Sequence, residues 1–356
     1  MRVLVALSGG VDSSVAAARL VAAGHDVVGA TLKLWGGESD SGCCSVSDVD
    51  DARRVADALG IDHHTFAYAE EFEAAVVGPY VAAHARGATP NPCMACNRHL
   101  KFGSLLARAD RLGFDAVATG HHARVAVGPD GRRRVARGAD AAKDQSYVLH
   151  MLDQATLART LFPIGGLTKD RVRAMAAELG LRTAHKPDSQ DVCFITSAEG
   201  RAAFLGRRAA LTPGVVRDRS GAEVGRVPAV ELVTVGQRRG LGLPGGGPKR
   251  HVLRVEPAYA RVTIGSADDL LVDRQVLGPV SWADRPVHGD LLAQCSAHGR
   301  AEPADVEAGP DGAVTLEWRS PRRRVAPGQA VVLYDGDTVL GSATITATRS
   351  PAEPRA

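Results

Sequence analysis

Long hydrophobic runs are missing from this sequence. No apolar stretch approaches the roughly 18 residues that a helix needs to cross a bilayer. A secretory leader is missing too, because Met1 leads directly into a strand–helix pattern. We therefore expect a cytoplasmic protein with no membrane partner. A strong net charge is also absent, and the value of +3 permits a polyanionic partner without requiring one.

The cysteines lack the patterns of a disulfide framework and of a zinc site. Six cysteines in a 356-residue cytoplasmic chain favour catalysis, redox chemistry or metal binding over structural cross-links. Cys93 and Cys96 form one C-x-x-C, but no second C-x-x-C or H-x-x-x-H follows, which weakens the case for zinc. A redox pair, an iron–sulfur site completed by Cys193, and plain structural thiols stay open. For the other three we expect buried structural thiols: Cys43, Cys44 and Cys295.

What the sequence does contain is an alternation of strands and helices through its first half. Short apolar runs predict buried strands at 2–7, 27–34, 63–68 and 116–119. Amphipathic stretches predict helices at 13–23, 48–59, 70–85, 102–112 and 169–179. Strands that alternate with helices favour an α/β fold, a Rossmann-like doubly wound parallel sheet.

The pattern changes after about residue 195, where helical periodicity fades and Gly and Pro become frequent. Short, alternating, β-branched segments dominate from about residue 272, and Asp335-Gly336-Asp337 predicts a hairpin between two of them. A chain of this length suits two or three domains. We expect an α/β catalytic domain, a small central domain, a C-terminal β-barrel domain and a frayed tail, at 1–198, 199–271, 272–348 and 349–356.

The segment Leu7–Ala16, LSGGVDSSVA, joins the first predicted strand to the first predicted helix. Gly9 and Gly10 let the backbone approach an anion, and the start of a helix offers N–H groups without helical partners. The lysine of the ATPase P-loop is missing, and Asp12 stands in the loop instead. A carboxylate beside phosphates is useful if it helps to hold Mg²⁺. The loop therefore predicts a nucleotide-phosphate site with Asp12 as a metal ligand.

This loop resembles that of the N-type ATP pyrophosphatases, which cleave ATP between the α- and β-phosphates and adenylate a carbonyl or carboxyl oxygen. Other segments narrow the resemblance to the bacterial tRNA-specific 2-thiouridylases, along nearly the whole chain. They are SGGVDSS, TPNPCMACNRHLKF, ATGHHAR, RGADAAKDQSYVLHML, LFPIGG, KPDSQDVCFI, VGQRRGLGL and PGQAVVLYDGD. The resemblance implies adenylation of the C2 carbonyl of a wobble uridine, then sulfur transfer to give 2-thiouridine, AMP and pyrophosphate.

The resemblance also implies a site. Its cofactors are ATP and Mg²⁺, and its nucleotide contacts are Ala6, Leu7, Ser8, Gly9, Gly10, Val11, Asp12, Ser13, Leu32 and Gly120. Cys193 carries the sulfur as a persulfide, and Cys96 either frees hydrosulfide from it or resolves a Cys96–Cys193 disulfide. Many relatives have Asp where this chain has Cys93. Cys93 then serves as a proton carrier or as the third thiolate of an iron–sulfur cluster, and we favour the persulfide route.

The partner implied by the resemblance is tRNA, with the wobble uridines of the Lys, Glu and Gln acceptors as targets. The implied contacts are His121, Lys143, Asp144, Gln145, Arg300 and Gln329. Ala301 replaces a tyrosine that often follows the arginine in relatives, so we expect one stacking contact to be lost. A sulfur-donor protein, such as a cysteine desulfurase or a relay protein, is also implied. The loop alone leaves open a synthetase of the same superfamily that acts on a small metabolite, and a non-catalytic RNA-binding or iron–sulfur protein that kept the fold.

Overall fold

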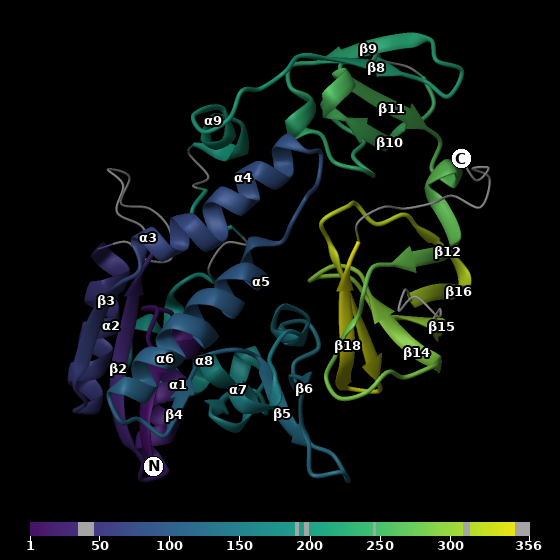
Figure 1. Ribbon diagram of the computed structural model, residues 1–356. Helices are drawn as coiled ribbons and strands as arrows, with labels where there is room; N and C mark the ends of the chain where they lie inside the picture. Colours follow the sequence, from purple (N-terminus) through teal and green to yellow (C-terminus); the bar gives the residue numbers. More distant parts are fainter. Residues whose placement is uncertain (35–45, 189–191, 196–198, 245–246, 309–313, 346–356) are drawn as a thin grey trace. The chain divides into compact units, whose positions relative to one another are not determined.

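The computed structural model describes residues 1–34, 46–188, 192–195, 199–244, 247–308 and 314–345 (Figure 1). It divides into two compact units. The first is built from 1–77, 92–196 and the short stretch 337–339. The second combines 78–91 with the remaining chain after residue 196. Within the described ranges, no helix is both long enough and apolar enough to cross a membrane.

A five-stranded parallel sheet lies at the centre of the first unit, in the order β3-β2-β1-β4-β7. The strands are β1 Arg2–Ala6, β2 Asp26–Lys33, β3 His63–Ala67, β4 Ala116–Ala118 and β7 Thr160–Leu161. The chain adds β2 and β3 on one side of β1, and β4 and β7 on the other. The predicted doubly wound α/β fold is therefore confirmed. Sheets of this kind bind ligands at the carboxyl ends of their strands where the order reverses, here between β1 and β4.

Helix α1, Val11–Ala22, packs on two neighbours because its small residues allow close approach. Ala17 and Leu20 join a core with β1 and with α2, Val46–Leu59. Val11 and Val15 pack against α8, Lys169–Glu178. The remaining helical segments of this unit are α3 Ala69–Phe72, η1 Glu73–Val77, α5 Pro92–Cys96, η2 Asn97–Ser104, α6 Leu105–Arg111, η3 Ser146–Leu149, α7 Gln154–Ala158 and η4 Arg182–His185.

One helix begins ten residues earlier than the sequence pattern predicts. The helical segment expected at 102–112 starts at Pro92 and runs through α5, η2 and α6. Proline is well tolerated in the first turn of a helix, where its missing N–H has no partner in any case. The middle part, η2, has π-helical hydrogen bonding, so its side chains do not follow the 3.6-residue period on which the prediction depended.

The second unit contains two antiparallel β assemblies. The first is a four-stranded sheet, β10-β11-β8-β9, in which β11 and β8 alone run parallel. Its strands are β8 Gly214–Arg217, β9 Glu223–Val227, β10 His251–Glu256 and β11 Arg261–Gly265. Short helical segments flank them: α9 Gly200–Gly206, η5 Val230–Leu232, η6 Pro257–Tyr259 and η7 Asp268–Leu270.

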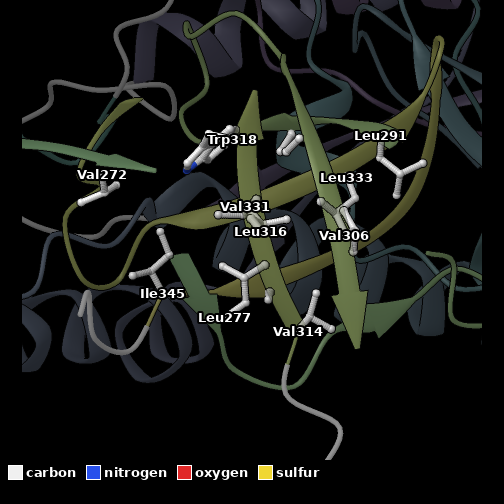
Figure 2. Packing of buried hydrophobic residues seen from close by; sticks show 13 residues of the cluster. Val272, Leu277, Leu291, Val306, Val314, Leu316, Trp318, Val331, Leu333 and Ile345 are labelled. Atoms are coloured by element: carbon white, nitrogen blue, oxygen red, sulfur yellow. The ribbon is translucent and has the colours of Figure 1, made fainter. Parts of the chain in front are cut away.

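The C-terminal strands form the second assembly and enclose an apolar core (Figure 2). They follow the order β12-β16-β15-β14-β17-β18, with β13 on β18. Their bounds are β12 Leu271–Leu277, β13 Ser281–Trp282, β14 Gly289–Gln294, β15 Glu302–Ala308, β16 Val314–Arg323, β17 Ala330–Asp335 and β18 Thr338–Thr344. Figure 2 shows Leu316, Val331 and Leu333 side by side within this core. The predicted hairpin is confirmed, with Gly336 at φ +53° between β17 and β18.

The segment 78–91 belongs with these β domains although it precedes them by more than a hundred residues. It contains α4, Gly78–Ala85, whose His84 is buried against the carbonyl oxygen of Glu231, with Nδ1 at 3.3 Å. Further along, the amide of Thr89 donates to the carbonyl oxygen of Pro327 at 2.8 Å. The sequence gives no sign of this long-range pairing.

Candidate active site

The loop that follows β1 is built for close backbone approach. Gly9 has φ +71°, and a Cβ there would stand 2.2 Å from the carbonyl oxygen of Asp48, so only glycine fits. At Gly10 the nearest described atom to an added Cβ is the Ser8 hydroxyl, at 3.4 Å. Gly10 is also the N-cap of α1 and provides no side-chain cap for the first-turn amides. These N–H groups form a surface suited to an anion, as the sequence predicts.

The serine hydroxyls hold the loop in this shape. Ser13 and Ser14 are buried, and both hydroxyls donate to the carbonyl oxygen of Gly10, at 3.0 and 2.8 Å. The amide of Ser8 donates to the Ser13 hydroxyl at 3.2 Å. The hydroxyl of Thr183, in η4, donates to that of Ser14 at 3.2 Å. A backbone fixed in this way presents its amides with little further ordering when it binds an anion.

Asp12 is paired with two basic side chains that are distant in the sequence. Lys169 Nζ donates to both carboxylate oxygens, at 2.9 and 2.7 Å, and His122 Nε2 lies 3.2 Å from Oδ1. Burial alone would raise the pKa of Asp12. Hydrogen bonds from His122 and Lys169, together with the charge of Lys169, outweigh burial and hold this pKa below its ordinary value. Asp12 is therefore an ionised carboxylate that already has a lysine counterion.

A second carboxylate, Asp188, gathers three cations. Lys169 lies 2.9 Å from it, Lys143 donates to it at 2.8 Å, and Arg173 of α8 donates at 2.8 Å. Burial would raise the pKa of Asp188, but the hydrogen bonds and charges of Lys143 and Lys169 prevail and lower it far below the ordinary range. Lys169 thus lies between the carboxylates of Asp12 and Asp188. Of these two, Asp188 also pairs with Lys143 and Arg173.

The end of β4 closes on the start of α1. A Cβ on Gly120 would lie 2.5 Å from the amide nitrogen of Ser13, so glycine is required there for packing. The next residue, His121, is buried, with Nδ1 2.7 Å from the hydroxyl of Thr119. Rings of Phe102 and Phe162 surround it, with centroids 6.1 and 6.0 Å away. Burial holds the pKa of His121 well below 6.5, which keeps its imidazole neutral.

The cysteines singled out by the sequence are anchored to one region. Cys93 and Cys96 lie in the first and second turns of α5, and Cys96 is buried. Cys193 lies in a turn just before Phe194, whose ring meets Phe72 edge-on with centroids 5.6 Å apart. Phe72 ends α3, and η1, which follows it, packs against α5. The two sulfur-bearing segments therefore share the α3–η1 segment as a neighbour.

The residues present suit the two implied cofactors differently. In the described part of the chain, no three His, Cys, Asp or Glu side chains gather so that they could hold a metal ion. The structure therefore adds no support for an iron–sulfur cluster on Cys93, Cys96 and Cys193, which stays an alternative to the persulfide route. Mg²⁺ needs less from the protein, because one carboxylate and substrate phosphates suffice. Asp12 fits that role if Lys169 releases its oxygens.

Comparisons with known proteins place the chain in a family. Models of a tRNA methyl transferase HUP domain, PRC-barrel domain and aminomethyltransferase β-barrel domain match residues 1–197, 202–266 and 276–345. The tRNA-specific 2-thiouridylase MnmA of Acidothermus cellulolyticus is 49% identical over 363 residues, covering 99% of both chains. That of Chloroflexus aurantiacus is 46% identical over 351 residues, covering 96% of this chain and 98% of its own. The chain belongs to the tRNA-specific 2-thiouridylase family.

Full coverage by 2-thiouridylases leaves the small-metabolite and non-catalytic alternatives without support. The Mycolicibacterium smegmatis relative, 48% identical over 363 residues, covers 97% of this chain and 99% of its own. Solved structures match less: NMN synthetase from Francisella tularensis covers 55% of this chain at 20% identity, with a TM-score of 0.36. The family name thus comes from the sequence relatives alone.

Three consecutive residues that 2-thiouridylases are expected to use on tRNA have partners within the first unit. Asp144 accepts hydrogen bonds from Arg137 at 2.8 Å, from the Gly138 amide at 2.9 Å and from the Ser146 hydroxyl at 2.8 Å. Gln145 accepts from the backbone amide of His122 at 2.9 Å, and Lys143 pairs with Asp188. These contacts show that the three residues help to hold the first unit together. Their predicted contact with tRNA stays a prediction.

The other expected 2-thiouridylase contacts are scattered. Arg300 is exposed between β14 and β15, and Gln329 donates to the carbonyl oxygen of Thr89 within the second unit. Leu32 is buried in β2. Burial raises the pKa of Cys295 to about 12, as expected for an inert structural thiol. The remaining pair, Cys43 and Cys44, lies outside the described residues.

Sequence reasoning missed Lys169, Asp188 and the role of His122. Lys169 is 157 positions away from Asp12, and no local pattern marks it as a partner of the loop. One usable signal exists, because Thr168 and Asp170 identify the start of a helix and place Lys169 at its first position. A positive charge at the N-terminal end of a helix interacts unfavourably with the helix dipole. The lysine at this position therefore indicates that Lys169 has a task other than stabilising α8.

Proposed function

We propose that this chain is an ATP-dependent sulfurtransferase that converts a uridine of tRNA to 2-thiouridine. The observation that carries the proposal is the phosphate-binding loop, with Gly9, Gly10 and Asp12, in a chain 46–49% identical to named 2-thiouridylases over nearly its whole length. The descriptions of the matching family models refer to methyl transfer. A nucleotide-phosphate loop together with Cys96 and Cys193 suits adenylation and sulfur transfer better than methyl transfer.

In the first step, the uridine C2 carbonyl oxygen attacks the α-phosphorus of ATP, pyrophosphate leaves, and C2 gains AMP as a leaving group. The amides at the start of α1 bind and orient the phosphates, and Gly9 and Gly10 keep side chains out of their way. Asp12 would hold Mg²⁺, which would neutralise charge on the phosphates when bound. His122 helps to hold Asp12 in position through its Nε2 contact.

In the second step, sulfur replaces the activated oxygen. The Cys96 thiolate attacks the Cys193 sulfur of a persulfide, hydrosulfide leaves with the electron pair, and that hydrosulfide attacks C2 and expels AMP. Alternatively the terminal persulfide sulfur attacks C2 first, and Cys96 then cleaves the resulting sulfur–sulfur bond. Either order ends in one 2-thiouridine and one Cys96–Cys193 disulfide, which an external thiol must reduce. Cys93, which shares α5 with Cys96, is proposed as a proton carrier.

The finer assignments are part of the same proposal. The target is the wobble uridine of tRNAs for Lys, Glu and Gln, and a persulfide-bearing donor protein reloads Cys193. A wobble base must leave its stack to reach such a site, so contacts to the tRNA backbone are needed elsewhere on the chain. We assign these to the C-terminal β domains, including Arg300, and to Lys143 of the first unit.

The test is thiolation of an unmodified tRNA with ATP, Mg²⁺, a cysteine desulfurase and cysteine, read by mass spectrometry of the nucleosides. Cys193→Ser is expected to abolish 2-thiouridine while leaving ATP affinity unchanged. Cys295→Ser is the matched control, because that partly buried thiol packs against the β core and is expected to leave activity intact. Full thiolation by Cys193→Ser would eliminate the persulfide role. Pyrophosphate release that does not depend on tRNA would contradict the proposed substrate.

A further inference from the structure

The phosphate loop contains no lysine of its own, but the fold brings Lys169 next to it. Lys169 Nζ lies 2.7 and 2.9 Å from the Asp12 oxygens, in the first turn of α1 where the free amides are. An anion bound by those amides is within a few ångströms of Asp12, so a modest rotation of the lysine side chain brings Nζ to it. In ATPase P-loops, a lysine within the loop itself reaches the β- and γ-phosphates.

The backbone of Lys169 is held firmly, which fixes the origin of its side chain. Its amide donates to Asp140 at 2.9 Å, and Thr168 caps α8 through the amide of Arg171. Val172, one turn further on, is fully buried in the core shared with α1. The Lys169 side chain is only 10% exposed, so it is directed into the site and not into solvent.

The surrounding charges allow Lys169 to change partners. Breaking a buried ion pair is unfavourable when it leaves a carboxylate alone. Asp188 would keep Lys143 and Arg173 at 2.8 Å if Lys169 turned away. Asp12 would keep His122 and would regain two oxygens for a divalent cation. Neither carboxylate is therefore stranded when the ammonium group moves to a phosphate.

We propose that Lys169 binds the part of ATP that leaves as pyrophosphate, and that Asp188 is a positioning residue that directs this lysine. The proposal rests on the nucleotide use set out above and adds the residue that contacts the β- and γ-phosphates. It follows that ATP and inorganic pyrophosphate depend on Lys169, whereas AMP, which lacks those phosphates, does not.

The experiment compares dissociation constants of ATP, pyrophosphate and AMP for the full chain without tRNA, in the presence of Mg²⁺. A charge-assisted hydrogen bond is worth enough that Lys169→Met should weaken ATP and pyrophosphate about 10- to 100-fold, with AMP changed less than about threefold. Lys169→Arg keeps the charge and should restore most of the ATP affinity. Arg171→Met is the matched control on the same helix, since Arg171 pairs only with Glu178 among described side chains.

Asp188 is tested by a double-mutant cycle. Asp188→Asn alone should weaken ATP about 3- to 10-fold, and added to Lys169→Met it should cause little further loss, because it acts through the lysine. Equal loss of ATP and AMP affinity in Lys169→Met, or unchanged ATP affinity, would overturn the proposal. If Lys169→Met fails to fold, Lys169→Gln takes its place, and an ATP-to-AMP preference equal to that of wild type would overturn the proposal. Wild type that binds ATP but never thiolates tRNA would refute the proposed function and leave the Lys169 assignment standing.

Discussion

Gly120→Ala tests how tightly the end of β4 holds the phosphate loop. A Cβ there would lie 2.5 Å from the amide nitrogen of Ser13 and 2.7 Å from the carbonyl carbon of Asp12. Ordinary van der Waals contact begins near 3.4 Å, so the strand end and the start of α1 must separate by about 0.9 Å. Gly120 does not have a positive φ, so the added methyl group acts through this contact and not through backbone strain.

The expected loss follows from overpacking against backbone atoms that cannot rotate away. Such insertions typically remove 1–3 kcal/mol, and we expect about 2 kcal/mol from the first unit. In a domain of this size each kcal/mol lowers Tm by about 2–4 °C, so its transition should fall by about 4–8 °C. The displaced Ser13 amide also disturbs the phosphate surface, and ATP affinity should fall about tenfold or more.

The assay combines a thermal melt with an ATP titration on the same preparation. Gly166→Ala is the matched control, because no described atom lies within 4 Å of a Cβ at Gly166, and it should match wild type in both measurements. A Gly120→Ala protein that melts like wild type would refute the packing argument. Normal stability combined with lost ATP affinity would mean that Gly120 acts as a direct nucleotide contact instead.

Three further outcomes are expected. Burial and the charge of Arg201 lower the pKa of His84 to about 4, so the unfolded chain takes up a proton below pH 6.5 before the folded chain does. The second unit should therefore lose about 2 kcal/mol between pH 7 and pH 4.5 in urea titrations, and a His84→Gln protein with the same pH slope would contradict this. Asp144→Ala removes the acceptor of hydrogen bonds from Arg137, the Gly138 amide and Ser146 and should lower stability by about 2–4 kcal/mol, whereas a pure tRNA contact would change only the KM for tRNA. Leu333→Ala empties part of the β core and should lower stability by about 3 kcal/mol in denaturant melts, and a loss below 1 kcal/mol would argue against the packing in Figure 2.

Local patterns were sufficient to predict four of the five sheet strands of the first unit and its helices α1, α2 and α8. Strands such as β1 and β2 are mostly apolar, and α1 and α8 end near glycines, so their periods and boundaries are visible in the sequence. The start of α5 at Pro92 was missed because η2 departs from the α-helical period. Strand order and the pairing of α4 with the β domains depend on contacts between distant residues, for which a single sequence carries no local signal.

The candidate site divides in the same way. The loop was predictable because Gly9 and Gly10 have a backbone task that no other residue type performs as well. Lys169 was not, because its function depends on α8 packing against α1, which brings together residues 157 positions apart. Resemblance indicated which cysteines matter, and the structure adds Phe72 and Phe194 as the contact that links the Cys193 segment to α3.

The pairing of 78–91 with the second unit has a consequence for how the chain is made. During synthesis α4 leaves the ribosome 147 residues before Glu231, the residue whose carbonyl oxygen its His84 contacts. At about 5–20 residues per second, this helix waits roughly 7–30 s with its apolar side chains uncovered. The contacts that complete the surroundings of α4 therefore form only after the second unit has been made. For the same reason, a fragment cut at residue 198 would carry an orphaned helix directly before Cys93 and Cys96.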